Sequence, residues 1–366
     1  MLRNMSDMYR RKLHAWVSPC KMKILILLLT IHSSTDAATL TGSSEYALSG
    51  IEFILTCTVP DEANSVQLYR RPDVTALLGS IQVAGGQCYN TATTTPVICS
   101  PDVCSCTATL SNYGTVFQWV IQPQTKDHGS TWFCRRSNPR LPEHDRVVES
   151  PDYTLKVAVP VSTVTMTTAG LYDPSVMITA GNNRNFLCST SASRPVAKIA
   201  WFRGDKNITD QAGTAIDQDA SNDMYTRQQS LTITGSVGDT DSGLKCEAVN
   251  IEGRIPISSQ TSNIIIQWAP QTDPSLTRDP ANETLTDGIY VTMTCRQVGG
   301  KPLATLTWSG VCSFWNTQID SRDNTTVTSS IQFSLNKTYT GLVCICVSRH
   351  PVNSYQKSVN QTFDVL

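Results

Sequence analysis

Apolar and polar side chains alternate along many short stretches of this chain. Residues 51–56, 116–121 and 231–234 show the pattern most clearly. A period of two is typical of strands with one buried face, because successive side chains point to opposite faces. The 40% content of hydrophobic residues in alternating rather than continuous runs therefore predicts soluble all-β domains.

One arrangement of cysteine, tryptophan and strand recurs along the chain. Cys188 ends an apolar run, Trp201 follows thirteen residues later, and an alternating strand and an Asp-Ser-Gly turn precede Cys246. Cys295 and Trp308 repeat the spacing of thirteen. A Cys…Trp…Cys pattern with short alternating strands resembles the immunoglobulin superfamily, in which a disulfide joins two packed sheets and the indole covers it.

This resemblance implies three tandem immunoglobulin-like β-sandwiches, and the length of 366 residues agrees with more than one core. We expect domain 1 at 38–159, domain 2 at 160–268 and domain 3 at 269–366. Domain 1 looks variable-like, whereas domains 2 and 3 look constant-2-like. Together they are similar to the ectodomains of cell-adhesion and immune receptors.

The first 37 residues differ from the rest and predict a secretory signal peptide. A basic stretch precedes the apolar run 24–31, and small residues then lead to an expected cleavage after Ala37. Met22 is an alternative start. The apolar run is shorter than the ~20 residues that a membrane-spanning helix needs, and no later run is longer. We therefore expect a secreted protein, or the ectodomain of a cell-surface receptor if the sequence is truncated.

Charge and cysteine content agree with an extracellular protein. Beyond residue 37, 23 Lys and Arg face 28 Asp and Glu, which gives a net charge of −5 and argues against nucleic acid as a partner. Cys20 precedes the cleavage point, so twelve of the thirteen cysteines remain. Close pairs such as Cys104 with Cys106 could instead bind zinc, but export favours disulfides.

The resemblance implies the core disulfides. Cys57 would pair with Cys134 and Cys188 with Cys246. In domain 3 we prefer Cys295 with Cys344, because residues 340–344 align with 242–246, and this leaves Cys312 for Cys346. Pairing of Cys295 with Cys346 is the competing choice.

Domain 1 departs from the family pattern in two ways. Leu68 stands where the core tryptophan belongs, and Trp132 stands where a corner tyrosine is usual. Four further cysteines lie between the core pair. Cys104 and Cys106 point the same way on a strand and cannot easily bridge each other, so each should pair with Cys88 or Cys99.

Nothing in the sequence has the pattern of an enzyme. The chain lacks a nucleophile elbow, a phosphate-binding loop and a zinc-protease helix. Glu143, His144 and Asp145 could in principle bind a metal, but three adjacent residues rarely converge. We expect no catalytic residue, no metal and no cofactor.

Binding is the remaining class of function, and one sheet face is a candidate. If Leu68 and Cys134 face the core of domain 1, then Tyr69, Arg71, Phe133 and Arg135 face outward. Two exposed aromatics and two arginines have the composition of an interface hot spot. The resemblance adds that variable-type domains commonly use this face, and an ordinary solvated surface is the alternative.

Two further features bear on partners. The loop 136–149 carries Arg140, His144 and Arg146 at the position of an antigen-contacting loop, and Arg135 or Arg136 could meet a sugar carboxylate as in sialic-acid-binding relatives. Five glycosylation sequons leave domain 1 bare and lie at Asn207, Asn282, Asn324, Asn336 and Asn360.

We therefore expect a secreted glycoprotein of the cell-adhesion or immune-recognition type, with domain 1 as its binding head. The partner would be an extracellular protein or a cell-surface receptor, a second copy included, and a glycan is possible. The alternatives are a structural spacer of the extracellular matrix and a receptor ectodomain without its anchor.

Overall fold

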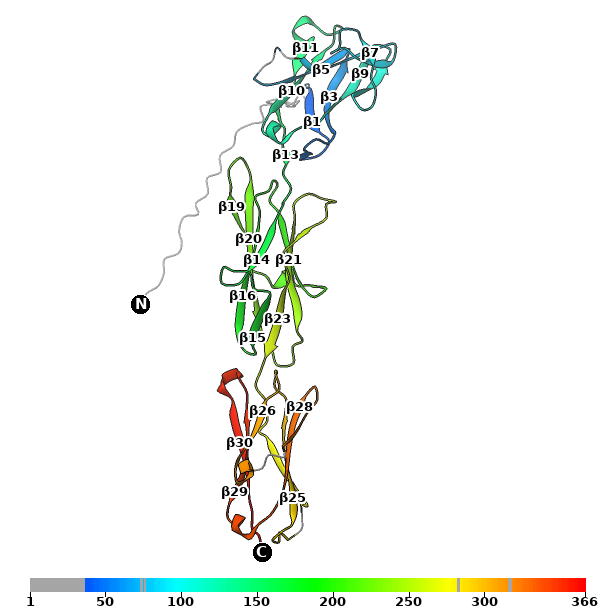
Figure 1. Ribbon diagram of the computed structural model, residues 1–366. Coiled ribbons are helices and arrows are strands. Elements are labelled where there is room, and N and C mark those ends of the chain that lie inside the picture. The colour runs from blue at the N-terminus through cyan, green and yellow to red at the C-terminus, as the bar shows by residue number, and fades with distance from the viewer. Residues whose placement is uncertain (1–36, 73–74, 76, 282–283, 315–317) are drawn as a thin grey trace, which may run out of the picture.

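The computed structural model describes residues 37–72, 75, 77–281, 284–314 and 318–366. The expected leader up to residue 36 and the sequon at Asn282 lie outside this part of the chain. The described residues form β-strands and short 3-10 helices in three bodies arranged end to end (Figure 1). No helix in the described part of the chain is long and apolar enough to cross a membrane.

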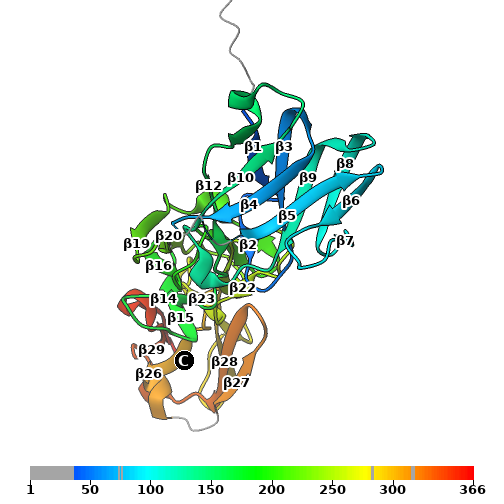
Figure 2. The ribbon, with the colours of Figure 1, turned by 90° about the horizontal axis from the view of Figure 1, so that it is seen from above.

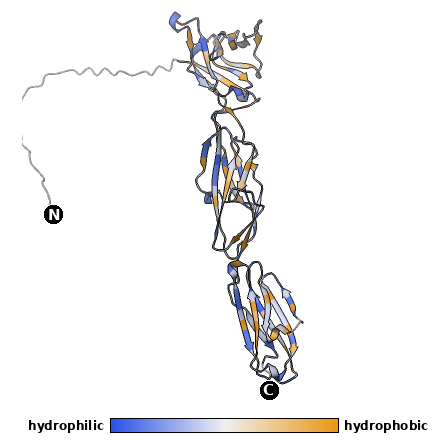
Figure 3. Cartoon of the chain, turned by 60° about the vertical axis from the view of Figure 1, so that its left-hand side comes forward, coloured by the Kyte–Doolittle hydropathy of each residue, from blue (hydrophilic) through white to orange (hydrophobic). Residues whose placement is uncertain are grey.

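Each body is a two-layer sandwich with its own core, which confirms the all-β tandem immunoglobulin-like fold. Buried apolar residues cluster separately between Ala38 and Val157, between Val161 and Ile266, and from Leu285 onward. Hydrophobic and hydrophilic positions alternate along the strands (Figure 3). The period of two in the sequence therefore corresponds to inward and outward faces.

Domain 1 has the larger pair of sheets, and Figure 2 shows its two layers. The first sheet has the order β1-β3-β9-β8, and its strands are β1 Thr39–Gly42, β3 Phe53–Ala63, β9 Tyr113–Ile121 and β8 Cys104–Leu110. The second has the order β11-β10-β4-β5-β6-β7, with β12 beside β10, and its strands are β11 Val147–Glu149, β10 Thr131–Ser137, β4 Ser65–Arg70, β5 Leu77–Ala84, β6 Gln87–Asn90, β7 Val97–Ile98 and β12 Tyr153–Thr154. A parallel pair closes the base, formed by β2 Ala47–Leu48 and β13 Val157–Ala158. The extra strands at the β6 and β7 edge agree with a variable-type domain.

Domain 2 packs four strands against six. The first sheet has the order β14-β16-β20-β19, with β14 Val164–Thr167, β16 Asn183–Thr190, β20 Tyr225–Thr234 and β19 Ile216–Asp219. The second has the order β15-β23-β21-β17-β18, with β22 beside β21, and its strands are β15 Ser175–Thr179, β23 Ser262–Gln267, β21 Ser242–Val249, β17 Lys198–Arg203, β18 Lys206–Asn207 and β22 Ile257–Ser258.

Domain 3 packs four strands against three. The first sheet has the order β24-β25-β28-β27, with β24 Ser275–Asp279, β25 Tyr290–Val298, β28 Thr326–Ser334 and β27 Ile319–Arg322. The second has the order β26-β29-β30, with β26 Thr305–Gly310, β29 Val343–Arg349 and β30 Gln356–Thr362. The connections of the three domains contain the 3-10 helices η1 Thr125–Asp127, η2 Glu143–Asp145, η3 Thr209–Gln211, η4 Val311–Phe314, η5 Lys337–Tyr339 and η6 Val352–Ser354.

The same cross-strand pair lies at the centre of every domain. Trp201 is directly opposite Cys246, and Trp308 is directly opposite Cys346. In domain 1 Leu68 takes this place opposite Cys134 and is fully buried. The alignment of Leu68 with the core tryptophan therefore agrees with the strand register.

The structure pairs Cys57 with Cys134 and Cys188 with Cys246, across sequence separations of 77 and 58 residues. Our preferred pairing in domain 3 is wrong. Cys295 bonds to Cys346 and Cys312 bonds to Cys344.

The register of β29 explains the correction in domain 3. Cys344 and Cys346 are both buried on the inner face, so alternation alone does not separate them. Cys346 is opposite Trp308 and faces β25, whereas Cys344 is opposite Gly310, next to the helix η4 that carries Cys312. Gly341 lies five residues before Cys346, whereas Gly243 lies three residues before Cys246, so matching the two glycines shifted the alignment by two residues.

Two additional bridges close one side of domain 1. Cys88 on β6 bonds to Cys106 on β8, and Cys99 bonds to Cys104. Both bridges are among the pairings that the sequence left open, in which Cys104 and Cys106 each bond to Cys88 or Cys99. Because β6 and β8 belong to opposite sheets, the first bridge ties the two layers together at the edge that the extra strands form.

Polar contacts fix the joint between domains 1 and 2. Arg194 of domain 2 is buried and donates to the carbonyl oxygens of Val157 (2.6 Å) and Asn222 (2.7 Å). His128 accepts from the Val157 N–H through Nδ1, and its Nε2 lies 3.1 Å from Asp223 Oδ2. The backbone of Val157, where the chain leaves domain 1, is therefore hydrogen-bonded to one residue of each domain.

The joint between domains 2 and 3 is similarly short. Lys301 Nζ lies 2.5 Å from Asp241 Oδ1 and 5.7 Å from the centre of the Trp268 ring. Backbone hydrogen bonds join Trp268 to Lys301 in both directions. These contacts leave no long flexible linker between the domains.

The pairing in domain 3 predicts an asymmetry between two double variants. Cys312→Ser with Cys344→Ser removes one matched bridge, whose loop of 32 residues is worth about 4 kcal/mol in the chain-entropy model. Cys312→Ser with Cys346→Ser removes one cysteine from each bridge and should destabilise domain 3 by roughly twice as much. Amide exchange of the β25 residues in the full chain measures both changes, and the reverse ranking would support the pairing of Cys295 with Cys344.

The additional bridges of domain 1 predict a second ranking. Loops of 18 and 5 residues correspond to about 3 and about 2 kcal/mol, so Cys88→Ser with Cys106→Ser should cost more than Cys99→Ser with Cys104→Ser. Amide exchange of β3 and β9 in the full chain tests this. Equal protection in both variants and the parent chain would show that neither bridge stabilises the core.

Candidate functional site on domain 1

The four candidate residues meet on the outer face of the second sheet of domain 1. Tyr69 on β4 is directly opposite Phe133 on β10. Arg71 follows Tyr69 by two residues and Arg135 follows Phe133 by two, so alternation places all four side chains on one face. We call these four residues the Arg-aromatic cluster.

The two rings of the Arg-aromatic cluster are not exposed, and in this respect our prediction is wrong. Tyr69 is 7% exposed and Phe133 is fully buried. The rings stack with their centroids 5.3 Å apart, and each is covered by a guanidinium group. Arg71 lies 4.4 Å from the Phe133 ring centre and Arg135 lies 4.7 Å from that of Tyr69. The arginines thus separate the rings from water through cation–π contacts.

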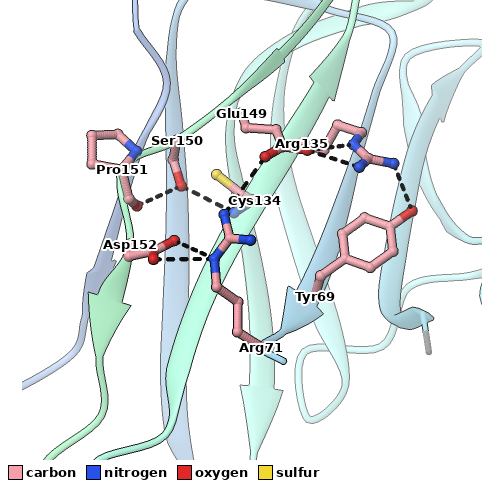
Figure 4. Close-up of polar contacts among 8 residues, drawn as sticks. All are labelled: Tyr69, Arg71, Cys134, Arg135, Glu149, Ser150, Pro151 and Asp152. Atoms are coloured by element: carbon pink, nitrogen blue, oxygen red, sulfur yellow. Dashed lines mark hydrogen bonds and ion pairs between the residues drawn. The ribbon is translucent and has the colours of Figure 1, made fainter. Parts of the chain in front are cut away.

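Two carboxylates neutralise the arginines (Figure 4). Arg71 Nε donates to Asp152 Oδ1 at 2.8 Å, and Arg135 Nη2 lies 2.7 Å from Glu149 Oε1. Glu149 also lies 3.8 Å from Arg71, so it links the two arginines. The hydrogen bond with Glu149 is the main cause that raises the pKa of Arg135 above its ordinary value. The cluster is therefore a closed network rather than two free cations beside two free rings.

An uncharged row of side chains crosses the same face beside the cluster. It runs through six strands by direct cross-strand pairing. Its members, which we call the cross-strand row, are Val147, Ser137, Ser65, Gln82, Tyr89 and Ile98. Val147 is 54% exposed and Ile98 is 61% exposed. The sequence analysis missed this row, because the pairing of β5, β6 and β7 depends on turns whose register the alternating pattern does not fix.

The arginines of the loop that follows β10 are exposed, and each also contacts a neighbouring group of domain 1. Arg140 lies 3.9 Å from the centre of the Tyr113 ring, and Arg146 Nε donates to the Leu141 carbonyl. Arg136 is only 2% exposed and Arg135 is paired with Glu149, so neither presents a free guanidinium to a sugar carboxylate. This geometry argues against Arg136 as a ligand of sialic acid, whereas the hypothesis for the partly exposed Arg135 stays a prediction.

The described residues contain no group of three or more His, Cys, Asp and Glu side chains that could hold a metal ion. His144 Nε2 lies 3.0 Å from Asp145 Oδ2 on η2; His144 is exposed and Asp145 is half-buried. Four predicted sequons lie within the described part of the chain, and each of their asparagines is exposed: Asn207, Asn324, Asn336 and Asn360.

Comparison with known proteins agrees with the sandwich architecture. The family model of the CD80-like C2-set immunoglobulin domain matches residues 170–254, within domain 2. Nephrin from Mus musculus is 23% identical over 189 residues, which are 52% of this chain and 14% of nephrin. Nephrin from Rattus norvegicus is 23% identical over 188 residues, with 51% and 14% covered. The matched segment thus spans about one seventh of these relatives.

Solved structures with a similar fold are ectodomains built from several domains. The full ectodomain of mouse nectin-like molecule 4 covers 87% of this chain and 95% of its own length, at 14% identity and a TM-score of 0.42. The D1–D4 ectodomain fragment of ICAM-5 covers 90% and 76%, at 18% identity and a TM-score of 0.42. The D1–D2 fragment of Rst covers 62% and 99%, at 16% identity and a TM-score of 0.38.

The Arg-aromatic cluster predicts measurable coupling between an arginine and the ring beneath it. In a double-mutant cycle of Arg71→Ala and Phe133→Leu in the full chain, the two changes should couple by about 0.5–1 kcal/mol, the range for a cation–π contact at an exposed site. Arg71→Met is the matched control, because it keeps the covering stem and removes the charge. Purely additive free energies of unfolding would show that Arg71 does not cover the ring in solution.

Proposed function

We propose that this chain, which belongs to the immunoglobulin superfamily, acts by extracellular recognition of the cell-adhesion type, with the outer face of domain 1 as its binding surface. The cross-strand row carries this proposal. The outer face of the second sheet of domain 1 carries an uncharged row that crosses six strands, and the exposed apolar residues Val147 and Ile98 stand at its two ends. Interfaces between proteins are typically depleted of charge at their centre and enriched in aromatic residues and arginine.

The Arg-aromatic cluster gives this surface a rigid flank. Its side chains are held by stacking and ion pairs before any partner arrives, so little side-chain entropy is lost on binding. Arg135 and Glu149 remain partly exposed and can exchange contacts with a partner at the rim. Preorganisation of this kind favours a protein partner with a flat complementary face over a small ligand, which needs a concave site.

The partner we propose is an extracellular protein or cell-surface receptor, and a second copy of the chain is one candidate. Domain 1 contains no sequon, whereas the predicted glycosylation sites lie in domains 2 and 3. Glycans there would leave the domain 1 face uncovered. Secretion through the expected signal peptide would place the protein outside the cell, where the six disulfides are stable.

A structural spacer is the second candidate function, and the short joints favour it. The contacts of Arg194 and of Lys301 hold neighbouring domains with little free chain between them. A rod of this kind would separate two structures without using the face of domain 1. The two functions therefore differ in their response to changes on that face.

Charge introduced into the cross-strand row should distinguish recognition from spacing. Beads coated with the full chain are presented to beads with the same chain and to a layer of cells. Gln82→Lys and Ile98→Asp should each reduce binding at least about tenfold, because an unpaired charge in an interface centre costs several kcal/mol. Gln82 is half-buried and Ile98 is exposed, and both point away from the core, so neither substitution changes the core packing.

Thr58→Asp is the matched control, since Thr58 is exposed on the other sheet of domain 1. It should bind as the parent chain does. Recognition by this face would be contradicted if the parent chain bound neither surface, or if all three variants bound equally well.

A further inference from the structure

The first sheet of domain 2 has an outer face without charge. The outward positions of its two central strands are occupied by Asn185, Leu187 and Ser189 on β16 and, directly opposite, by Thr232, Ser230 and Gln228 on β20. The outward residues of the edge strands β14 and β19 are threonine, isoleucine and glutamine. All four strands belong to the described part of the chain. We call this surface the neutral face.

The charged residues of these strands all occupy the alternate positions. They are Arg184, Asp217, Asp219 and Arg227, and Arg227 Nε lies 2.6 Å from Asp217 Oδ1. The other sheet of domain 2 presents Lys198, Lys245 and Glu247 on its strands. Charged residues make up 16% of the chain, and they are absent from every outward position of these four strands, which marks the neutral face as different from the rest of the domain.

Two threonine hydroxyls of the outer face of the first sheet of domain 2 already hydrogen-bond to asparagine side chains across the strands. Thr232 Oγ1 donates to Asn185 Oδ1 at 2.8 Å, and Thr234 Oγ1 donates to Asn183 Oδ1 at 2.8 Å. A polar group that keeps its partner loses little when water is removed. Leu187 is 37% exposed and adds apolar area at the centre of the face. Covering the surface therefore costs little desolvation energy at these two pairs and at Leu187, and it buries no charge.

We propose that the neutral face is a lateral self-association surface, on which domain 2 of one chain packs against domain 2 of a second copy about a two-fold axis. A charged partner would bury its own charges against a surface that offers none in return. A second copy presents the same uncharged residues, and two-fold symmetry places this one surface on both sides of the contact. The chain beyond residue 37 carries 28 acidic and 23 basic side chains, so two copies repel each other through their net negative charge. The neutral face contributes no charge to this repulsion.

Accessibility and size agree with a weak contact. Asn207, the sequon of domain 2, lies on β18 in the opposite sheet. Figure 1 shows β25 and β28 of domain 3 on the opposite side of the long axis from β16 and β20, so the neutral face is confined to domain 2. Four strands of about five residues cover roughly 19 by 17 Å, which is below the ~800 Å² per partner of a stable interface. Self-association should thus need high concentration.

Sedimentation equilibrium of the full chain up to about 1 mM tests the proposal, since weak protein contacts have dissociation constants up to this range. The parent chain should follow a monomer–dimer equilibrium. Leu187→Lys and Leu187→Glu should each weaken the dimer at least about tenfold, because like charges then meet across the axis. An equimolar mixture of the two variants should restore association. Ser230→Lys provides a second position at the centre of the face if Leu187 variants fold poorly.

Asn263→Lys is the matched control, since it adds the same charge at an exposed position of the other sheet of domain 2. It should leave the dimer unchanged. A parent chain that stays monomeric throughout, or Lys and Glu variants that associate as the parent does or fail to recover on mixing, would overturn the proposal. Association lost with Gln82→Lys but kept with Leu187→Lys would place self-association on domain 1 and overturn only the proposal for domain 2.

Discussion

One cross-strand pair determines the geometry of each domain. A cysteine whose disulfide crosses to the other sheet lies directly opposite a large apolar residue, which is Leu68, Trp201 or Trp308. The disulfide fixes the distance between the layers, and the apolar partner fills the space beside it. Because side chains alternate, fixing this pair as inward also fixes every second residue of both strands as outward.

The outer faces that result have different chemistry in the first two domains. In domain 1, the residues next to Leu68 and Cys134 are Tyr69 and Phe133, and their stacking brings two arginines and two carboxylates together at the surface. In domain 2, the outward residues of the sheet β14-β16-β20-β19 are uncharged, and two threonine–asparagine pairs among them are hydrogen-bonded. One surface is therefore preorganised for recognition, whereas the other is easily covered by an equally neutral surface.

Much of this arrangement could be predicted from the sequence, and the failures have physical causes. The spacing of cysteine and tryptophan predicts the sandwiches, because core residues must recur with the strand period. It does not distinguish Cys344 from Cys346, since both face inward and only the register against Trp308 decides between them.

The expected exposure of Tyr69 and Phe133 was wrong because alternation gives the direction of a side chain but not what covers it. Glu149 and Asp152 were missed because they follow a long loop, and the sequence does not show where the chain rejoins the sheet after it. In the structure Glu149 lies opposite β10 and Asp152 lies beside Arg71. The neutral face emerges only when β14, β16, β20 and β19 are aligned.

The central claim, that the outer face of domain 1 is the surface used in recognition, is tested most directly by radical footprinting of the full chain bound to cells. The account predicts that Tyr89 and Ile98 lose labelling on binding, while Leu171 of domain 2, which is 75% exposed, is labelled as in the free protein. Unchanged labelling of Tyr89 and Ile98 in the bound chain would contradict it.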